Sequence, residues 1–128
     1  MDKTAFKART KTYALNVITL VESLPRCRTA DVLGKQLLRS ATSVAANYRA
    51  ACRARSNAEF ISKMCIVEEE ADECLFWFEL LIGSGLVKQE NISRLLNEGD
   101  QIVAMTIASI KTARQRGLNP QSEFRNPQ

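Results

Sequence analysis

The stretch from residue 30 to residue 82 has a helical pattern with one break, at Ser56, and this constrains the fold more than any other feature. Ser56 is followed by Glu59, the capping-box pattern that starts a helix. On both sides of the break, apolar residues recur at spacings of three and four. Since one residue separates two long helices, we expect them to fold back on each other.

Helical periodicity continues outside this pair. Four helices are predicted, at about residues 4–24, 29 or 30–55, 56–82 and 88 or 90–116. Five glycines and three prolines are few breakers for a chain of 128 residues, which favours long helices over strands and turns. The predicted fold is therefore all-α, an antiparallel up-down-up-down four-helix bundle over residues 1–117. Residues 118–128 are expected to form a disordered tail.

The net charge of +4 hides a strong division along the chain. Residues 1–55 contain eleven Lys and Arg against three carboxylates, whereas residues 56–110 contain three against ten. One interpretation is internal, with basic helices lying beside an acidic helix. The other is an anionic partner for the basic surface that stays exposed.

A basic stripe follows the second predicted helix, opposite its apolar face. It comprises Lys35, Arg39, Arg49 and Arg53, with Arg55 at the turn. Either these side chains pair with the acidic third helix, a neighbouring subunit or solvent, or they bind the phosphate backbone of RNA or DNA. Tyr48 is the only aromatic residue on this helix and is expected to face the core. Nucleic-acid binding is then expected to be electrostatic, salt-sensitive and weakly sequence-specific.

The third predicted helix is apolar in nearly every direction between residues 74 and 82. A helix that is apolar all round must be buried on more than one side, and one small core cannot cover it. Phe76 and Trp77 are therefore predicted to lie in a subunit interface, so the protein is expected to form a homo-oligomer.

Two polar residues lie at the margin of the second helix's apolar face, and they suggest a role in helix registry. Ser43 and Asn47 are expected to hydrogen-bond with Glu70 or Glu73 of the third helix. The other carboxylates around them point in several directions, which is typical of a solvated or salt-bridged surface. No catalytic role is assigned to this cluster.

The sequence contains no histidine and no glycine-rich phosphate loop. The usual general base, the Ser–His and Cys–His nucleophiles and the imidazole metal ligand are thus missing. The four cysteines form no C-x-x-C pair and are interpreted as small buried hydrophobes. We therefore expect no enzymatic activity, no cofactor and no metal site. With no apolar run long enough for a signal peptide or a membrane span, the protein is expected to be cytoplasmic.

Three consecutive segments resemble the bacterial family known from open reading frames in 23S rRNA intervening sequences. They are QLLRSATSVAANYRAACRARS (residues 36–56), AEFISKMCIVEEEADE (residues 58–73) and LFWFELL (residues 75–81). Their order and spacing carry the resemblance, which extends over roughly residues 7–116. It implies a four-helix bundle and a homopentamer, and it implies no catalytic residues.

The chain departs from the family pattern at two places. Many members have Asn-Ile-Ala-Glu-Gly where this chain has residues 47–51, so Ala50 replaces an acidic residue and Arg49 adds a charge. A small-Gly-Ser turn is replaced by residues 66–68, and the chain thus resembles the Asn-Tyr-Arg subgroup. A more distant similarity is to the accessory variability determinant of diversity-generating retroelements, a basic pentamer associated with reverse transcriptase and nucleic acid.

Two functions are consistent with these features. The first is a non-enzymatic, oligomeric protein that associates with RNA through the basic stripe. The second is a protein–protein interaction scaffold that binds no nucleic acid.

Overall fold

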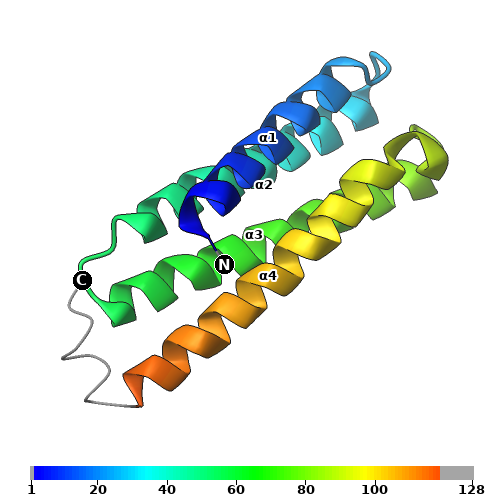
Figure 1. The fold of residues 1–128 in the computed structure, drawn as a ribbon. Helices are drawn as coiled ribbons and strands as arrows, with labels where there is room; N and C mark the ends of the chain where they lie inside the picture. Colours follow the sequence, from blue (N-terminus) through cyan, green and yellow to red (C-terminus); the bar gives the residue numbers. More distant parts are fainter. Residues whose placement is uncertain (1, 119–128) are drawn as a thin grey trace.

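The computed structural model describes residues 2–118, which form four α-helices in an up-down-up-down bundle (Figure 1). The helices are α1 (Lys3–Glu22), α2 (Arg28–Cys52), α3 (Asn57–Gly83) and α4 (Ser93–Gly117), and a 3-10 helix, η1 (Gln89–Ile92), precedes α4. The predicted all-α bundle is confirmed. Of the predicted tail, residues 119–128 lie outside the described residues. Within residues 2–118, no helix has the length and apolar character needed to cross a membrane.

The predicted start of α3 at Ser56 is confirmed by its cap. The side chain of Ser56 accepts a hydrogen bond of 3.1 Å from the N–H of Glu59. The Glu59 carboxylate reaches the N–H of Arg55, at 3.5 Å, instead of that of Ser56. Asp2 caps α1 in a similar way, since its side chain accepts from the N–H of Thr4 at 2.9 Å.

Other boundaries differ from the prediction by a few residues. The N-cap of α2 is Cys27, which makes no side-chain capping hydrogen bond, and not Thr29 or Ala30. This helix ends at Cys52 because Arg53 leaves the helical conformation, with φ −102° and ψ 10°. Gly85 follows α3 with a φ of 79°, a conformation that a residue with a Cβ rarely adopts.

The core runs along the axis of the bundle and is apolar. Its largest fully buried side chains come from all four helices: Phe6, Tyr13, Val17, Leu37, Val44, Tyr48, Met64, Val67, Phe78, Leu81 and Ile102. α2 makes its most extensive contact with α3, and α4 and α1 pack on the outer sides of this pair. The contact between α1 and α4 is the least extensive of the four.

A single arginine bridges the α1–α4 contact. The Nε and Nη2 atoms of Arg9 donate to the two carboxylate oxygens of Glu98, at 2.7 and 2.8 Å. Nη2 also donates to Gln101, and Nη1 lies 3.0 Å from the sulfur of Met105. This bidentate pair joins the first helix to the last, although the sequence analysis assigned no role to either residue.

Gly99 allows α4 to approach the core closely. A Cβ at this position would lie 2.9 Å from Leu75 Cδ2 and 3.0 Å from the hydroxyl oxygen of Tyr13. Tyr13 is fully buried and Leu75 is half-buried against the core, so an added Cβ would force these side chains to shift. The glycine interrupts the helical pattern in the sequence because the packing around it leaves no space for a side chain.

We therefore expect Gly99→Ala to lower the free energy of unfolding by about 1–2 kcal/mol, because overpacking outweighs the better helix propensity of alanine. The matched control is Gly83→Ala, where a Cβ meets nothing within 4 Å. That variant should be unchanged or more stable by at most about 1 kcal/mol. Urea unfolding followed by circular dichroism measures both. Equal stability of the two variants would contradict the packing argument.

Candidate nucleic-acid interface

The starts of α1 and α3 and the ends of α2 and α4 meet at one end of the bundle. Asn57 Nδ2, at the start of α3, donates to the carbonyl oxygen of Ala113 near the end of α4, at 2.7 Å. Lys3 Nζ, at the start of α1, lies 5.3 Å from the ring centroid of Phe60. The end of α2 joins this group through the short connection to α3 (Figure 1).

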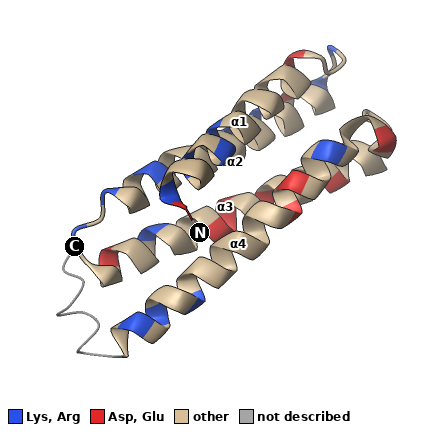
Figure 2. Cartoon of the chain, viewed as in Figure 1, with Lys and Arg blue, Asp and Glu red and all other residues tan. Residues whose placement is uncertain are grey.

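Positive charge gathers at this end of the molecule (Figure 2). Residues 2–7, 48–63 and 110–117 contain nine Lys and Arg and only two carboxylates. The nine residues, which we call the basic pole, are Lys3, Lys7, Arg49, Arg53, Arg55, Lys63, Lys111, Arg114 and Arg116. All are exposed except the half-buried Lys63. None of them forms an ion pair with another of the described residues, so their charge is available to a partner.

The basic stripe predicted from the sequence is divided between different parts of the structure. Arg49, Arg53 and Arg55 belong to the basic pole. Lys35 is exposed but lies about 27 Å from Arg53 along α2, estimated from the helical rise. A ligand held at the pole therefore reaches Lys35 only if it extends along the helix.

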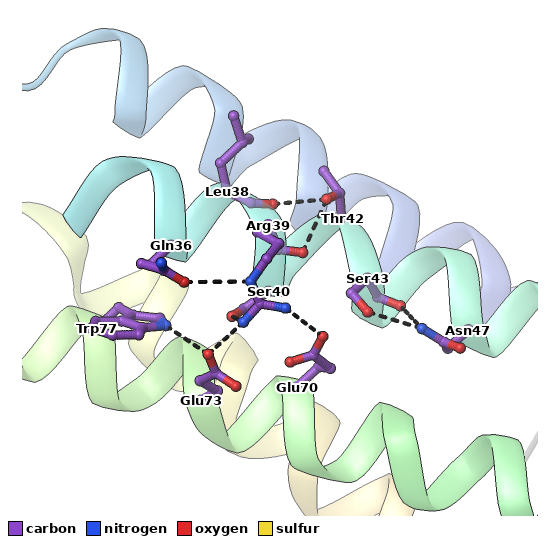
Figure 3. A network of polar contacts seen from close by, with 10 residues as sticks. All are labelled: Gln36, Leu38, Arg39, Ser40, Thr42, Ser43, Asn47, Glu70, Glu73 and Trp77. Carbon is purple, nitrogen blue, oxygen red and sulfur yellow. Dashed lines mark hydrogen bonds and ion pairs between the residues drawn. The ribbon is translucent and has the colours of Figure 1, made fainter. Parts of the chain in front are cut away.

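Arg39 forms its ion pairs with residues of the same chain (Figure 3). Its Nη1 lies 2.9 Å from a carboxylate oxygen of Glu70, and its Nη2 pairs with Glu73. The same Nη2 donates to Ser40 Oγ at 3.1 Å. The acidic helix α3 thus neutralises this guanidinium. For Arg39, this agrees with the interpretation that the stripe pairs with the acidic helix. We leave Arg39 out of the candidate interface.

The Arg39 network changes the acidity of its members. The hydrogen bond to Glu70 raises the pKa of Arg39. Desolvation acts to raise the pKa of Glu73, but the hydrogen bond from Trp77 and the charge of Arg39 outweigh it and hold that pKa below its usual value. Both groups are therefore charged near neutral pH, and they link α2 to α3.

Ser43 and Asn47 do not make the expected contact with the acidic helix. Asn47 Nδ2 donates to the carbonyl oxygen of Ser43 at 3.0 Å and to its hydroxyl at 2.9 Å (Figure 3). These bonds lie within α2, and the hydrogen bonds of Glu70 and Glu73 go to Arg39 and Trp77. The prediction that Ser43 and Asn47 contact Glu70 or Glu73 is therefore wrong. The longer side chain of Arg39 reaches across from α2 to these carboxylates instead.

Phe76 and Trp77 lie on the outer side of α3, with ring centroids 5.1 Å apart. Phe76 is 48% exposed, and Leu80, one turn further along, is 38% exposed. Trp77 is half-buried, and its Nε1–H donates to a Glu73 oxygen at 3.3 Å. The two aromatic residues and Leu80 thus form an apolar patch on α3. Their assignment to a subunit interface stays a prediction.

Sequence analysis missed part of the basic pole. Lys3, Lys7 and Lys63 were given no role, and Lys111, Arg114 and Arg116 were not connected with the stripe on the second helix. Lys3, Lys7 and Lys63 are separate cations in the sequence, whereas Lys111, Arg114 and Arg116 form a short cluster at the end of α4. Only the packing of α1, α3 and α4 beside the end of α2 brings the two groups together with Arg49, Arg53 and Arg55, so no local pattern could have joined them.

Comparison with known proteins finds the same fold in a solved structure and a matching family. The family model described as 23S rRNA-intervening sequence protein matches residues 3–108. The crystal structure of a protein of unknown function from the S23 ribosomal protein family of Bacteroides thetaiotaomicron VPI-5482 superposes with a TM-score of 0.80 and 34% sequence identity. That likeness covers 87% of this chain and 99% of the other. No curated protein matches.

Replacing Arg39 tests the link between α2 and α3. We expect Arg39→Ala to lower the free energy of unfolding at pH 7 by at most about 1 kcal/mol, because the side chain is 50% exposed. Lys35→Ala, the control one turn earlier, removes an exposed cation that pairs with none of the described residues, and it should be neutral within about 0.5 kcal/mol.

The effect of Arg39→Ala should also depend on pH. Because the folded-state pKa of Glu73 is lowered, its contribution is complete above the unfolded-state pKa of about 4.3 and is lost as the pH falls through the folded-state value. Urea unfolding at pH 7 and pH 3 should show the difference from the wild type shrinking at the lower pH. A constant difference would exclude the ion pair as its cause.

Proposed function

Because this chain belongs to the family of 23S rRNA-intervening sequence proteins, we propose that it is a non-enzymatic protein that binds RNA through its basic pole. The observation that carries this proposal is the convergence of nine Lys and Arg from four helices, with only two carboxylates among them. RNA is the proposed ligand because the family's description refers to 23S rRNA. A protein acting on ribosomal RNA works in the cytoplasm, which is the localisation we propose.

The chemistry of the pole suits a phosphate backbone. Arginine can hold a phosphate by two parallel hydrogen bonds, and five of the nine residues are arginines. The two carboxylates are already engaged at helix N-termini, Asp2 with Thr4 and Glu59 near Arg55. Binding of this kind releases counterions from the nucleic acid and weakens steeply as salt rises.

We also propose that the protein acts as a homo-oligomer, with the pentamer implied by the family resemblance as the specific assembly. The apolar patch on α3 supports this, because the exposure of Phe76 and Leu80 to water is unfavourable in a single subunit and would be relieved in an interface. An assembly would present several basic poles to one RNA. Linked sites bind more tightly together than each does alone, provided that the RNA can reach more than one of them.

The alternative function is a protein–protein scaffold that binds no RNA. It is favoured by a second exposed apolar pair, on α1, where Leu15 is 53% exposed and Ile18 38% exposed. These residues lie three apart and thus on the same side of the helix. If this function is correct, the basic pole serves only solubility or a protein contact.

Charge reversal distinguishes the two functions. We expect Arg53→Glu combined with Arg114→Glu to lower the affinity for a structured ribosomal RNA fragment by at least about tenfold at ~0.15 M salt. Affinity falls as salt rises, and the magnitude of the slope of log affinity against log salt should decrease by about 1.4–1.8 in this variant. Each of the two lost phosphate contacts contributes about 0.7–0.9 to that magnitude. Fluorescence anisotropy across a salt titration measures both quantities.

The matched control for this experiment is Arg26→Glu combined with Arg28→Glu, in exposed residues at the opposite end of the bundle. It changes the net charge by the same amount and should retain most of the affinity. Light scattering should give the same mass for both variants. Equal losses of affinity would contradict a localised site, and absence of binding by the wild type would favour the scaffold.

The apolar patch on α3 gives a separate prediction. Phe76→Ser combined with Leu80→Ser should shift the mass in sedimentation experiments toward that of a single subunit, because the change removes apolar area from the proposed interface. Ile107→Ser, at a 47% exposed position on α4, is the control and should leave the mass unchanged. An unchanged mass in the double variant would exclude this patch as the interface.

A further inference from the structure

A cavity of about 280 Å³ opens in the middle of the basic pole. It lies between the start of α1, the start of α3 and the last turns of α4, where α4 extends beyond the first helix. Among residues 2–118, Lys3 and Arg116 are the charged residues that line it, and no carboxylate of that range does. The cavity therefore favours an anionic ligand, or the uncharged part of a polyanion bound at the pole.

Among the residues that the structure describes, one accessible aromatic ring lies in the wall of the cavity. Phe60 is only partly buried, and the ammonium group of Lys3 lies over its ring, 5.3 Å from the centroid. A cation can take this position only if that face of the ring is not covered by other side chains. Since Lys3 is an exposed residue at the end of a helix, its side chain can move aside and leave the ring to a planar ligand.

Polar groups surround this ring. Asn57 donates its Nδ2 to the Ala113 carbonyl, and its Oδ1 makes no hydrogen bond with any residue from 2 to 118, so it can accept one from a ligand. Ser109 and Thr112 also line the cavity, whereas the hydroxyl of Tyr48 is fully buried and is not exposed to a ligand there.

The size of the cavity limits what can enter. Pockets for drug-sized ligands measure about 300–1,000 Å³, so about 280 Å³ suits a single ring system and not a folded peptide segment. Arg116, which lines the cavity, can hold a phosphate next to such a ring. Proteins that bind single-stranded RNA combine aromatic side chains for stacking, polar groups for the base edges and cations for the phosphates, and this cavity has all three.

We propose, on the basis of the proposed RNA binding, that this cavity receives one unstacked base of single-stranded or looped RNA, which stacks on Phe60 in place of the Lys3 ammonium. Bases inside a duplex cannot reach the ring, so the protein should prefer unpaired segments. The sequence led to an expectation of purely electrostatic binding, because Tyr48 is the only aromatic residue on the second helix and was expected to face the core; the ring proposed here, Phe60, lies on α3.

The test compares an unstructured ten-nucleotide RNA of mixed sequence with a strand of equal length whose nucleotides are abasic. By fluorescence anisotropy at ~0.15 M salt, the wild type should bind the RNA about 5- to 150-fold more tightly than the abasic strand. Phe60→Leu removes the aromatic face but keeps an apolar side chain, and it should abolish this preference. Phe60→Tyr keeps the aromatic face and should retain it. Circular dichroism confirms that both variants are folded.

A measurement on the unaltered protein makes the test independent of variant folding. A 2-aminopurine base in the strand should lose fluorescence on binding if it stacks on Phe60. Equal affinity of the wild type for the two strands, or an unchanged preference in Phe60→Leu, would overturn the base pocket. If both strands then still require Arg53 and Arg114, the proposed RNA-binding function stands without it. If the wild type binds neither strand nor the ribosomal fragment, both proposals fail.

Discussion

The packing of α2 against α3 is the contact on which the rest of the structure depends. Ser56 turns the chain between the two helices, and fully buried small residues, among them Ala41 and Ala71, let them approach closely. The ion pairs of Arg39, whose side chain is half exposed, add a weak polar link between the two helices. α1 and α4 pack on the outer sides of this pair, and Arg9 with Glu98 closes the weakest of the four contacts.

This topology also determines where charge accumulates. In an up-down-up-down bundle, the starts of α1 and α3 lie beside the ends of α2 and α4 (Figure 1). Cations in the last turns of α2 and α4 complement the negative ends of those helices, and Asp2 and Glu59 lie at the positive ends of the others. The cations outnumber what the helix ends require, and this surplus is the physical basis of the proposed RNA site.

Sequence reasoning succeeded where the relevant interactions are local. Helical periodicity and the capping pattern at Ser56 depend on residues within one or two turns, so the four helices and the position of the turn were predicted to within a few residues. It failed where the partner lies on another helix. A helical wheel places Arg39 and Asn47 on a surface, but it does not say which of them is long enough to reach Glu70.

Periodicity, capping and charge are properties of neighbouring residues, so the sequence alone predicts four helices in an all-α bundle, the antiparallel fold-back at Ser56, and a basic first half followed by an acidic third helix. The ion pairs of Arg39, the close packing at Gly99 and the gathering of nine cations at one pole follow only from the way the helices pack. These features join residues as far apart as Lys3 and Arg116. Their proximity arises from the packing of whole helices, which no local pattern encodes.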